Sequence, residues 1–151
     1  MVNWVQDYVP KNPAPFVLEV GAGNGTLLFA LQEAGYHANR IMGIDYSEDA
    51  VKLARAVGSA RSDGCECIKF ETCDFLKEHP ATLEESQGGI WDLVLDKGTF
   101  DAIALGERDA EGRSPADGYP LRIGQVVKPG GFFLITCSYR IYLASTLDSR
   151  R

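Results

Sequence analysis

The chain is 151 residues long, which is the length of one domain and is enough to bury a hydrophobic core. With 45% hydrophobic and 24% charged residues its composition is that of a globular protein, and no stretch approaches the roughly 20 apolar residues of a membrane span. Fifteen Lys and Arg residues stand against twenty-one Asp and Glu residues, so the formal net charge is −6. This charge disfavours nucleic acid as a partner and favours a cationic one, such as a lysine side chain of a basic protein.

The cysteines show no spacing that is typical of a zinc site, and no histidine lies near them at ligand spacing. They are Cys65, Cys67, Cys73 and Cys137. The chain also opens without a segment that resembles a signal peptide. We therefore expect no metal site, reduced thiols packed as small apolar side chains, and a cytoplasmic location.

The first half of the chain alternates short apolar runs with amphipathic segments, which predicts strands followed by helices. We expect strands at residues 16–20 and 40–45, and a helix at residues 26–34 that ends at Gly35. Ser47 is a natural N-cap for a second helix. Four apolar residues with helical spacing predict the buried face of that helix: Ala50, Leu53, Ala54 and Val57.

The second half continues the alternation. It predicts strands at residues 67–71, 90–95 and 132–136, helices at 99–105 and 120–127, a loop at 106–118 and a turn at 128–131. The polar stretch 77–89 is left without an assignment. Strands that alternate with helices indicate crossover connections, so we expect an α/β, Rossmann-like, doubly wound fold with a mostly parallel sheet and helices on both faces.

A glycine-rich run lies between the first predicted strand and the first predicted helix. It reads Glu19-Val-Gly-Ala-Gly-Asn-Gly25, with glycine at every second position. Glycine suits a loop in which the backbone turns tightly and approaches a ligand closely, while amides at the helix N-terminus point toward that ligand. A run of this kind alone is weak evidence, because dinucleotide-binding folds use a related pattern.

Carboxylates at the strand ends are more informative than the glycines. Asp45 ends the second strand, where a carboxylate can accept both ribose hydroxyls of a nucleoside cofactor. Asp74 ends the third strand and could accept from an adenine amine, with Phe75 packed near the ring. Glu19 and Asp96 add two more acidic groups, and such a set would repel a pyrophosphate but attract a sulfonium and an ammonium group. The sign of the charge thus favours S-adenosylmethionine over NAD.

The same residues have plain structural explanations. Asp45 and Asp74 could be polar residues that end strands, Glu19 could accept from loop amides, and the glycines could serve packing alone. The agreement of four strand ends favours the cofactor site over these separate explanations.

The set of motifs resembles the class I, seven-stranded methyltransferases that use S-adenosylmethionine. Within that superfamily the chain is similar to the protein-lysine methyltransferases that modify translation elongation factor 1-alpha. The motifs that carry this resemblance are Gly23-Asn-Gly25, Gly43-Ile-Asp-Tyr-Ser47, Gly131-Phe-Phe-Leu-Ile-Thr136 and, as the most specific, Asp96-Lys-Gly-Thr-Phe-Asp-Ala-Ile103.

The resemblance implies an enzyme with a protein substrate and S-adenosylmethionine as cofactor. We expect it to be a monomer, with no membrane or nucleic-acid partner. The residues that it implies for cofactor binding are Glu19, Gly21, Gly23, Asn24, Gly25, Asp45, Tyr46, Asp74, Phe75 and Asp96. Asp96 and Phe100 are the implied catalytic residues: the first would bind the lysine ammonium and the second would form an aromatic wall. Asp96 could equally do no more than close the cofactor pocket, and Trp4 could either cover the cofactor or anchor the chain in the core.

The C-terminal part departs from the family pattern. Members of the superfamily carry two further strands after the fifth, whereas here only residues 139–151 remain, enough for one short strand at 140–144. The family's Asn-Trp pair is replaced by the segment Thr136-Cys-Ser-Tyr-Arg140. We therefore expect a methyltransferase core at residues 1–138, with its last strands missing, and a divergent tail at 139–151.

Three functions remain open at this point. The first is a protein-lysine N-methyltransferase acting on elongation factor 1-alpha. The second is a catalytically impaired, cofactor-binding or interaction module, and the third is a methyltransferase for a small molecule, because substrate choice lies in loops outside the cofactor half.

Overall fold

A computed structural model of the chain describes residues 1–61, 63–83 and 91–137 and the backbone of residues 141–145. Its strands are β1 (Val17–Val20), β2 (Ile41–Asp45), β3 (Lys69–Thr72), β4 (Trp91–Lys97), β5 (Val127–Thr136) and β6 (Ile141–Ser145). Its helices are α1 (Val2–Tyr8), α2 (Thr26–Glu33), α3 (Glu48–Ala60), α4 (Thr99–Ala104) and α5 (Tyr119–Val126). Short 3₁₀ turns lie at residues 38–40, 65–67 and 115–118.

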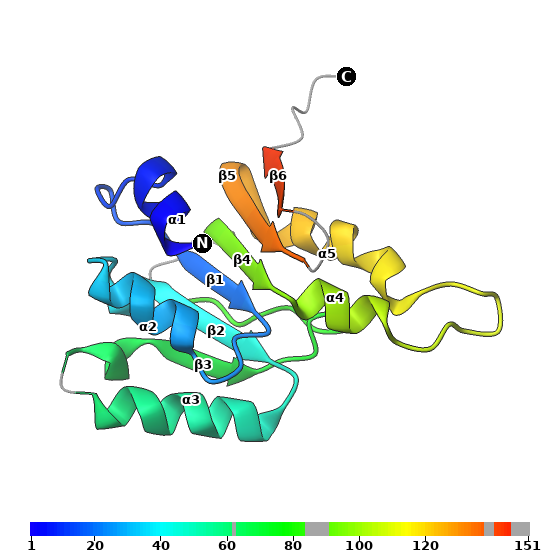
Figure 1. Ribbon diagram of the computed structural model, residues 1–151, viewed down its shortest axis with the longest axis horizontal. Coiled ribbons are helices and arrows are strands. Elements are labelled where there is room, and N and C mark those ends of the chain that lie inside the picture. The colour runs from blue at the N-terminus through cyan, green and yellow to red at the C-terminus, as the bar shows by residue number, and fades with distance from the viewer. Residues whose placement is uncertain (62, 84–90, 138–140, 146–151) are drawn as a thin grey trace.

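The strands form one sheet in the order β3-β2-β1-β4-β5-β6 (Figure 1). The first five strands are parallel, and β6 runs antiparallel to β5. Helices α1, α2 and α3 pack on one face of the sheet, while α4 and α5 pack on the other. This arrangement confirms the predicted doubly wound, Rossmann-like fold.

The buried face of α3 differs from the prediction. Of the four expected residues, Ala54 is buried and Val57 is partly buried against the same core, whereas Val51 and Gly58 are buried in addition. Leu53 is 52% exposed. Gly58 lies close to the Cys65 carbonyl, where an added Cβ would be 3.2 Å from the oxygen. The spacing of apolar residues does not predict such a backbone contact. The N-cap prediction is confirmed, since the Ser47 hydroxyl accepts from the Ala50 amide at 3.3 Å.

The predicted turn at residues 128–131 lies inside β5 as an irregularity of the ladder. Val127 pairs with Trp91 and Phe132 pairs with Leu93, so the residues between Val127 and Phe132 bulge out of the pairing. Gly130, with a φ of +82°, makes that bend possible.

A single short strand after β5 was expected, and β6 confirms it. Leu134 pairs with Leu143 at the centre of an antiparallel ladder. In the described part of the chain no further strand follows. Most of the tail proposed at 139–151 lies outside the described residues, as do 84–89 of the unassigned stretch 77–89, while 77–83 form no helix.

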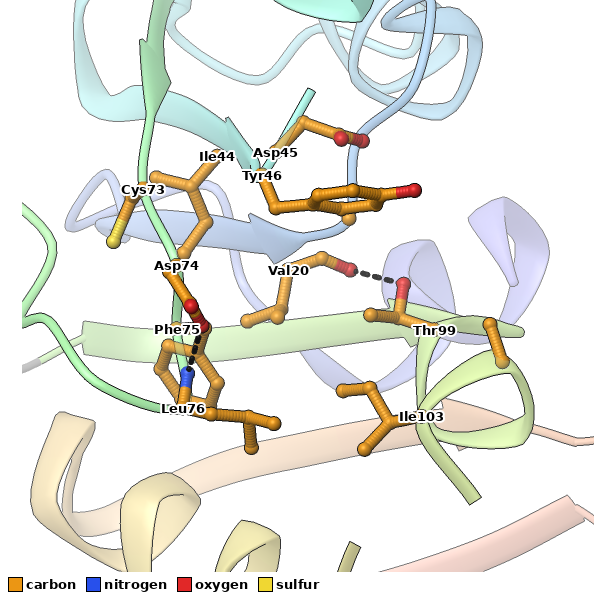
Figure 2. Close-up of a pocket in the computed structure, with 12 residues that line it drawn as sticks. Val20, Ile44, Asp45, Tyr46, Cys73, Asp74, Phe75, Leu76, Thr99 and Ile103 are labelled. Carbon is orange, nitrogen blue, oxygen red and sulfur yellow. Dashed lines mark hydrogen bonds between the residues drawn. The ribbon is translucent and has the colours of Figure 1, made fainter. Parts of the chain in front are cut away.

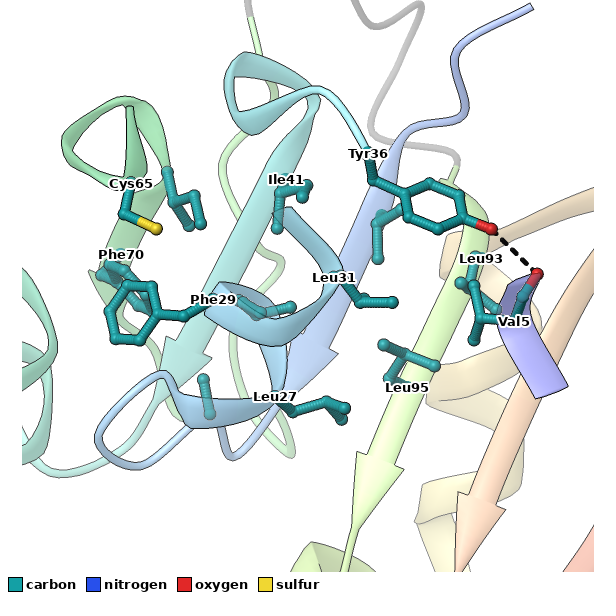
Figure 3. Close-up of a cluster of buried hydrophobic side chains, with 14 of the residues drawn as sticks. Val5, Leu27, Phe29, Leu31, Tyr36, Ile41, Cys65, Phe70, Leu93 and Leu95 are labelled. Atoms are coloured by element: carbon teal, nitrogen blue, oxygen red, sulfur yellow. Dashed lines mark hydrogen bonds between the residues drawn. The ribbon is translucent and has the colours of Figure 1, made fainter. Parts of the chain in front are cut away.

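Tyr36 joins the helix layer to the N-terminal helix on the α2 side of the sheet (Figure 3). Its ring is buried among the apolar residues of that face, with 3% exposure. Its hydroxyl lies 2.9 Å from the Val5 carbonyl oxygen and 2.8 Å from that of Val9, and it donates its one proton to this pair of acceptors. The bond closes the C-terminal end of α1 onto the turn that follows α2.

We expect the Tyr36→Phe variant to fold but to lose about 1 to 2 kcal/mol of unfolding free energy, because two buried carbonyls lose their shared donor. Urea denaturation measures the loss. Tyr8→Phe is the matched control, since Tyr8 is 60% exposed and its stability change should stay within about 0.5 kcal/mol. Equal midpoints for the two variants would contradict this role of the Tyr36 hydroxyl.

Candidate functional site

The candidate site lies at the carboxyl ends of the parallel strands. The chain winds from β1 toward β2 and β3 on one side and toward β4 and β5 on the other, so the strand order reverses between β1 and β4. In open α/β sheets a crevice forms at this reversal, and ligands bind there. The glycine loop, residues 21–25, emerges from β1 at this point.

Hydrogen bonds hold the glycine loop against β2 and α4. The amides of Gly21 and Ala22 both donate to the Ile44 carbonyl, at 2.8 and 2.9 Å. Gly21 has a φ of +70°, and a Cβ added to it would lie within 2.9 Å of three atoms of the Thr99 side chain. The Thr99 hydroxyl itself donates to the Val20 carbonyl at 2.8 Å. Thr99 therefore closes the crevice between β1 and β4 directly beneath Gly21.

Asp45 links the glycine loop to α3. One of its carboxylate oxygens accepts from the Gly23 amide and the other from the Ser47 amide, each at 2.9 Å. Two backbone donors leave further acceptor positions on the carboxylate for a ligand. Tyr46 follows it at the rim of the pocket and is 82% exposed (Figure 2).

Asp74 and Phe75 form the wall opposite the glycine loop. The Lys77 ammonium lies 2.8 Å from the Asp74 carboxylate, and this hydrogen bond is the main reason why the pKa of Asp74 lies below its usual value. Phe75 is 5% exposed, and its carbonyl accepts from the Arg122 guanidinium of α5 at 2.8 Å. The loop after β3 is thus fixed from behind by α5.

These elements enclose one pocket at the crevice, shown in Figure 2. Its lining is mostly apolar, with acidic and hydroxyl groups and no basic residue among the described residues that form it. The residues are Val20, Gly21, Ile44, Asp45, Tyr46, Cys73, Asp74, Phe75, Leu76, Thr99, Ala102 and Ile103. Five of the residues expected at a cofactor meet here: Gly21, Asp45, Tyr46, Asp74 and Phe75.

Glu19 lies next to this pocket but on the other face of the sheet, because β1 side chains alternate and Val17 packs among the α2-side residues. Its side chain is 2% exposed, and its Oε2 atom has no hydrogen-bond partner among the described residues. Burial raises the pKa of Glu19 to about 8; Lys97 lowers it, and Asp96 and Asp45 raise it further. A buried carboxyl with an unused oxygen suits a cationic or donor group that enters from the glycine loop.

Asp96 is fully buried and does not line the pocket. Its carboxylate accepts from the amides of Thr99 and Phe100, at 2.7 and 3.0 Å, and from the Tyr119 hydroxyl at 2.5 Å. Desolvation raises the pKa of Asp96 above its ordinary value, and these three bonds oppose the rise. All of its contacts in this structure are internal, so Asp96 organises the start of α4.

The remaining expected residues lie around the pocket. Phe100 is partly buried against the α5-side core, and the Asn24 side chain accepts from the Thr26 hydroxyl at 2.7 Å. Gly25 starts α2 with a φ of +81° and packs against Phe29 and Phe70. Trp4 stacks on Tyr8 and meets Phe132 of β5 edge to face at 5.7 Å, which is an anchor in the core; it does not line the pocket.

The sequence did not single out several residues that line the pocket. Ile44 and Ile103 stand inside two of the motifs but were not expected as site residues, and Leu76 stands in none. All three are apolar, and this property alone does not distinguish them from core. Thr99 carried a signal, since it follows Gly98 in the most specific motif, but its contact with Gly21 joins residues 78 positions apart.

In the part of the chain that the structure describes, no helix has the length and apolar character required to cross a membrane. Among the same residues, no group of three or more His, Cys, Asp or Glu side chains is placed to hold a metal ion.

Comparison with known sequences identifies the kind of domain. The family described as Methyltransferase domain matches residues 12–148. The protein-lysine N-methyltransferase efm4 of Schizosaccharomyces pombe is 36% identical in an alignment of 153 positions, which covers 93% of this chain and 62% of that protein. EEF1A lysine methyltransferase 2 of Homo sapiens is 34% identical over 137 residues, covering 90% and 52%. The chain therefore spans between half and two thirds of these relatives' lengths.

Solved structures share the fold. The glycopeptide N-methyltransferase MtfA complexed with S-adenosyl-L-methionine superposes with a TM-score of 0.65 at 16% identity, covering 89% of this chain and 51% of that one. Magnesium protoporphyrin IX methyltransferase from Synechocystis PCC 6803, with bound S-adenosylmethionine, superposes with a TM-score of 0.63 at 20% identity, covering 95% and 59%. The sequence match and this shared architecture lead to one conclusion: the chain belongs to the methyltransferase domain family and has the class I methyltransferase fold.

Proposed function

We propose that the chain binds S-adenosylmethionine in the crevice between β1 and β4 and works as the catalytic domain of a protein-lysine N-methyltransferase. The observation that carries the proposal is the pairing of an acidic rim with an apolar slot. Asp45 keeps acceptor capacity at the rim, and Phe75 and Ile103 contribute apolar walls. A nucleoside with a cationic tail suits such a site, whereas a pyrophosphate would meet no basic group among the described lining residues.

The described residues fit this cofactor. Asp45 would accept from the ribose hydroxyls, Phe75 and Leu76 would pack beside the adenine, and Asp74 would accept from its amine. The orphaned oxygen of Glu19 offers a partner for the ammonium group of the methionine part. When bound, the cofactor supplies an electrophilic methyl group. The protein's own contribution is to align a neutral amine with it and to exclude water.

The proposed substrate is translation elongation factor 1-alpha. Relatives with 33 to 36% identity carry names that describe lysine methylation of this factor or of proteins. The net charge of −6 favours a cationic partner. A lysine amine has an unperturbed pKa near ~10.4, so it must lose a proton before it can attack.

We further propose that the protein acts as a monomer in the cytoplasm, where translation takes place. Asp96 and Phe100 would shape the entrance for the substrate lysine. Residues 1–138 would form the methyltransferase core.

The test is calorimetric titration with S-adenosylhomocysteine. We expect wild-type protein to bind in the micromolar range and Asp45→Ala to bind about 100-fold more weakly, because a charged acceptor for the ligand is lost together with the bonds to the Gly23 and Ser47 amides. Asp49→Ala is the matched control: this carboxylate, in the first turn of α3, is 96% exposed, and its removal changes the net charge equally. A folded wild-type protein that does not bind would refute the cofactor assignment.

Transfer of radiolabel from the cofactor then tests the substrate. Label in recombinant elongation factor 1-alpha supports the proposal. Cofactor binding without transfer to any protein favours the impaired, cofactor-binding module. Label in small metabolites instead of protein favours a small-molecule methyltransferase.

A further inference from the structure

Tyr119 is placed to control the shape of the crevice without lining it. We propose that Tyr119 is a positioning residue, whose hydroxyl holds Asp96 so that the first turn of α4 closes the cofactor crevice; this inference rests on the proposed function. No motif of the sequence pointed to Tyr119.

The first step is the bond between α5 and β4. Tyr119 is the first residue of α5 and is 2% exposed, and Asp96 has no exposed surface. The hydroxyl donates to Asp96 Oδ2 at 2.5 Å, which is short for a hydroxyl and a carboxylate and marks a strong, charge-assisted hydrogen bond. Both partners are shielded from water, so the loss of one leaves the other without a substitute.

The second step leads from Asp96 to the pocket. Asp96 also accepts from the amides of Thr99 and Phe100, which are the first two residues of α4 and would otherwise lack partners. Thr99 in turn donates to the Val20 carbonyl and packs against Gly21. A continuous path of hydrogen bonds and contacts therefore runs from the Tyr119 hydroxyl to the floor of the crevice.

The ring of Tyr119 supports the same assignment. It meets Phe75 edge to face, with centroids 5.5 Å apart, and lies 5.4 Å from Phe100. Phe75 belongs to the pocket wall after β3, and Phe100 belongs to α4. One buried side chain thus touches both sides of the proposed site. Arg122, three residues later in the same helix α5, donates to the Phe75 carbonyl.

If Tyr119 only filled the core, loss of its hydroxyl would not change the pH at which Asp96 takes up a proton. The charged groups that act on Asp96 are Asp101 of α4 and Glu19 of β1, both acidic, and its pairing neighbour on β5 is the uncharged Ile135. The hydrogen bond from Tyr119 lowers the pKa of Asp96 against the rise caused by burial. Without it the carboxyl takes up a proton at higher pH, and a protonated carboxyl holds the two amides of α4 less well.

The experiment compares S-adenosylhomocysteine affinity of wild type and Tyr119→Phe between about pH 5 and pH 8. The variant keeps the ring contacts, and we expect its affinity at neutral pH to be about tenfold lower. The pH at which affinity is lost on acidification should be higher in the variant than in the wild type. Nuclear magnetic resonance should show the amide protons of Thr99 and Phe100 moving upfield, and this readout needs neither cofactor nor activity.

Two further variants sharpen the test. Tyr36→Phe also removes a buried tyrosine hydroxyl, and it should lose stability while keeping the wild-type affinity and pH dependence. In the Asp96→Asn background, which has no carboxyl to titrate, Tyr119→Phe should produce no shift with pH. A pH shift that persists there would overturn the proposal, as would unchanged amide signals or an affinity loss that is constant with pH. Failure of wild type to bind would instead refute the proposed function, while the amide signals would still report on Tyr119.

Discussion

Replacement of Gly21 by alanine is expected to remove cofactor binding and to lower the unfolding free energy by about 2 to 5 kcal/mol. Alanine is strained in the left-handed backbone conformation of this position, and its methyl group would overlap a neighbouring side chain. The φ of Gly21 is +70°, and the added methyl group would fall on the Thr99 side chain. The overlap is relieved only if the Thr99 side chain gives up its bond to the Val20 carbonyl or if the loop shifts away from the Ile44 carbonyl, which the Gly21 amide binds. Chemical denaturation and titration with S-adenosylhomocysteine measure both effects.

Two variants separate strain from overlap. Gly112→Ala introduces a similar strain, at a φ of +78°, but the added Cβ would meet no atom within 4 Å. It should cost about 1 kcal/mol and leave binding intact. The double variant Gly21→Ala, Thr99→Ala should regain part of the stability that Gly21→Ala loses. If Gly21→Ala and Gly112→Ala lost the same unfolding free energy, the overlap with Thr99 would contribute nothing to the loss.

The second large effect concerns Glu19→Gln and its dependence on pH. The folded pKa of Glu19, about 8, lies above the ordinary value of 4.5. Between these values the folded state therefore binds more protons than the unfolded state, and stability falls as the pH rises. The contribution of Glu19 is fully present below pH 4.5 and is lost by about pH 8, which amounts to up to about 5 kcal/mol. The amide has no charge to bury, so the variant should lack this loss.

The measurement is the difference in unfolding free energy between Glu19→Gln and wild type across that range of pH. We expect the difference to shift in favour of the variant as the pH rises, while its affinity for S-adenosylhomocysteine falls because the ammonium group loses the Glu19 carboxyl as its partner. Glu107→Gln, at an exposed position of the loop before α5, is the control and should give a difference that does not change with pH. A constant difference for Glu19→Gln would mean that this carboxyl is ionised in the folded protein at ordinary pH.

The strands of the sheet could be predicted from the sequence because each is a short apolar run with a turn signal at its end. The expected strand at 40–45 is found as β2, Ile41–Asp45, and the expected strand at 90–95 as β4, Trp91–Lys97. The location of the acidic residues at the strand ends was also predictable. Parallel strands place their carboxyl ends at one edge, so Asp45 and Asp74 had to meet near the glycine loop.

The sequence could not show on which face of the sheet a side chain lies or which distant residue it contacts. Glu19 and Asp96 were expected together at the cofactor, but their strands direct the two side chains to opposite faces. Asp96 finds its strongest partner in Tyr119, 23 residues later, and only the return of α5 across the sheet brings the two together. Contacts of this kind depend on the path of the whole chain, and local patterns do not record them.

The packing of α1 against β5 has a consequence for synthesis of the protein. Trp4 leaves the ribosome 128 residues before Phe132, on which it packs. At 5 to 20 residues per second, the helix waits roughly 6 to 26 s for its partner. The central strand β1 pairs with β2 along one edge, and its other edge stays unpaired until β4 has been synthesised. A nascent chain therefore exposes the apolar residues of α1 and an open sheet edge for seconds, an interval in which chaperones that bind emerging polypeptides would act.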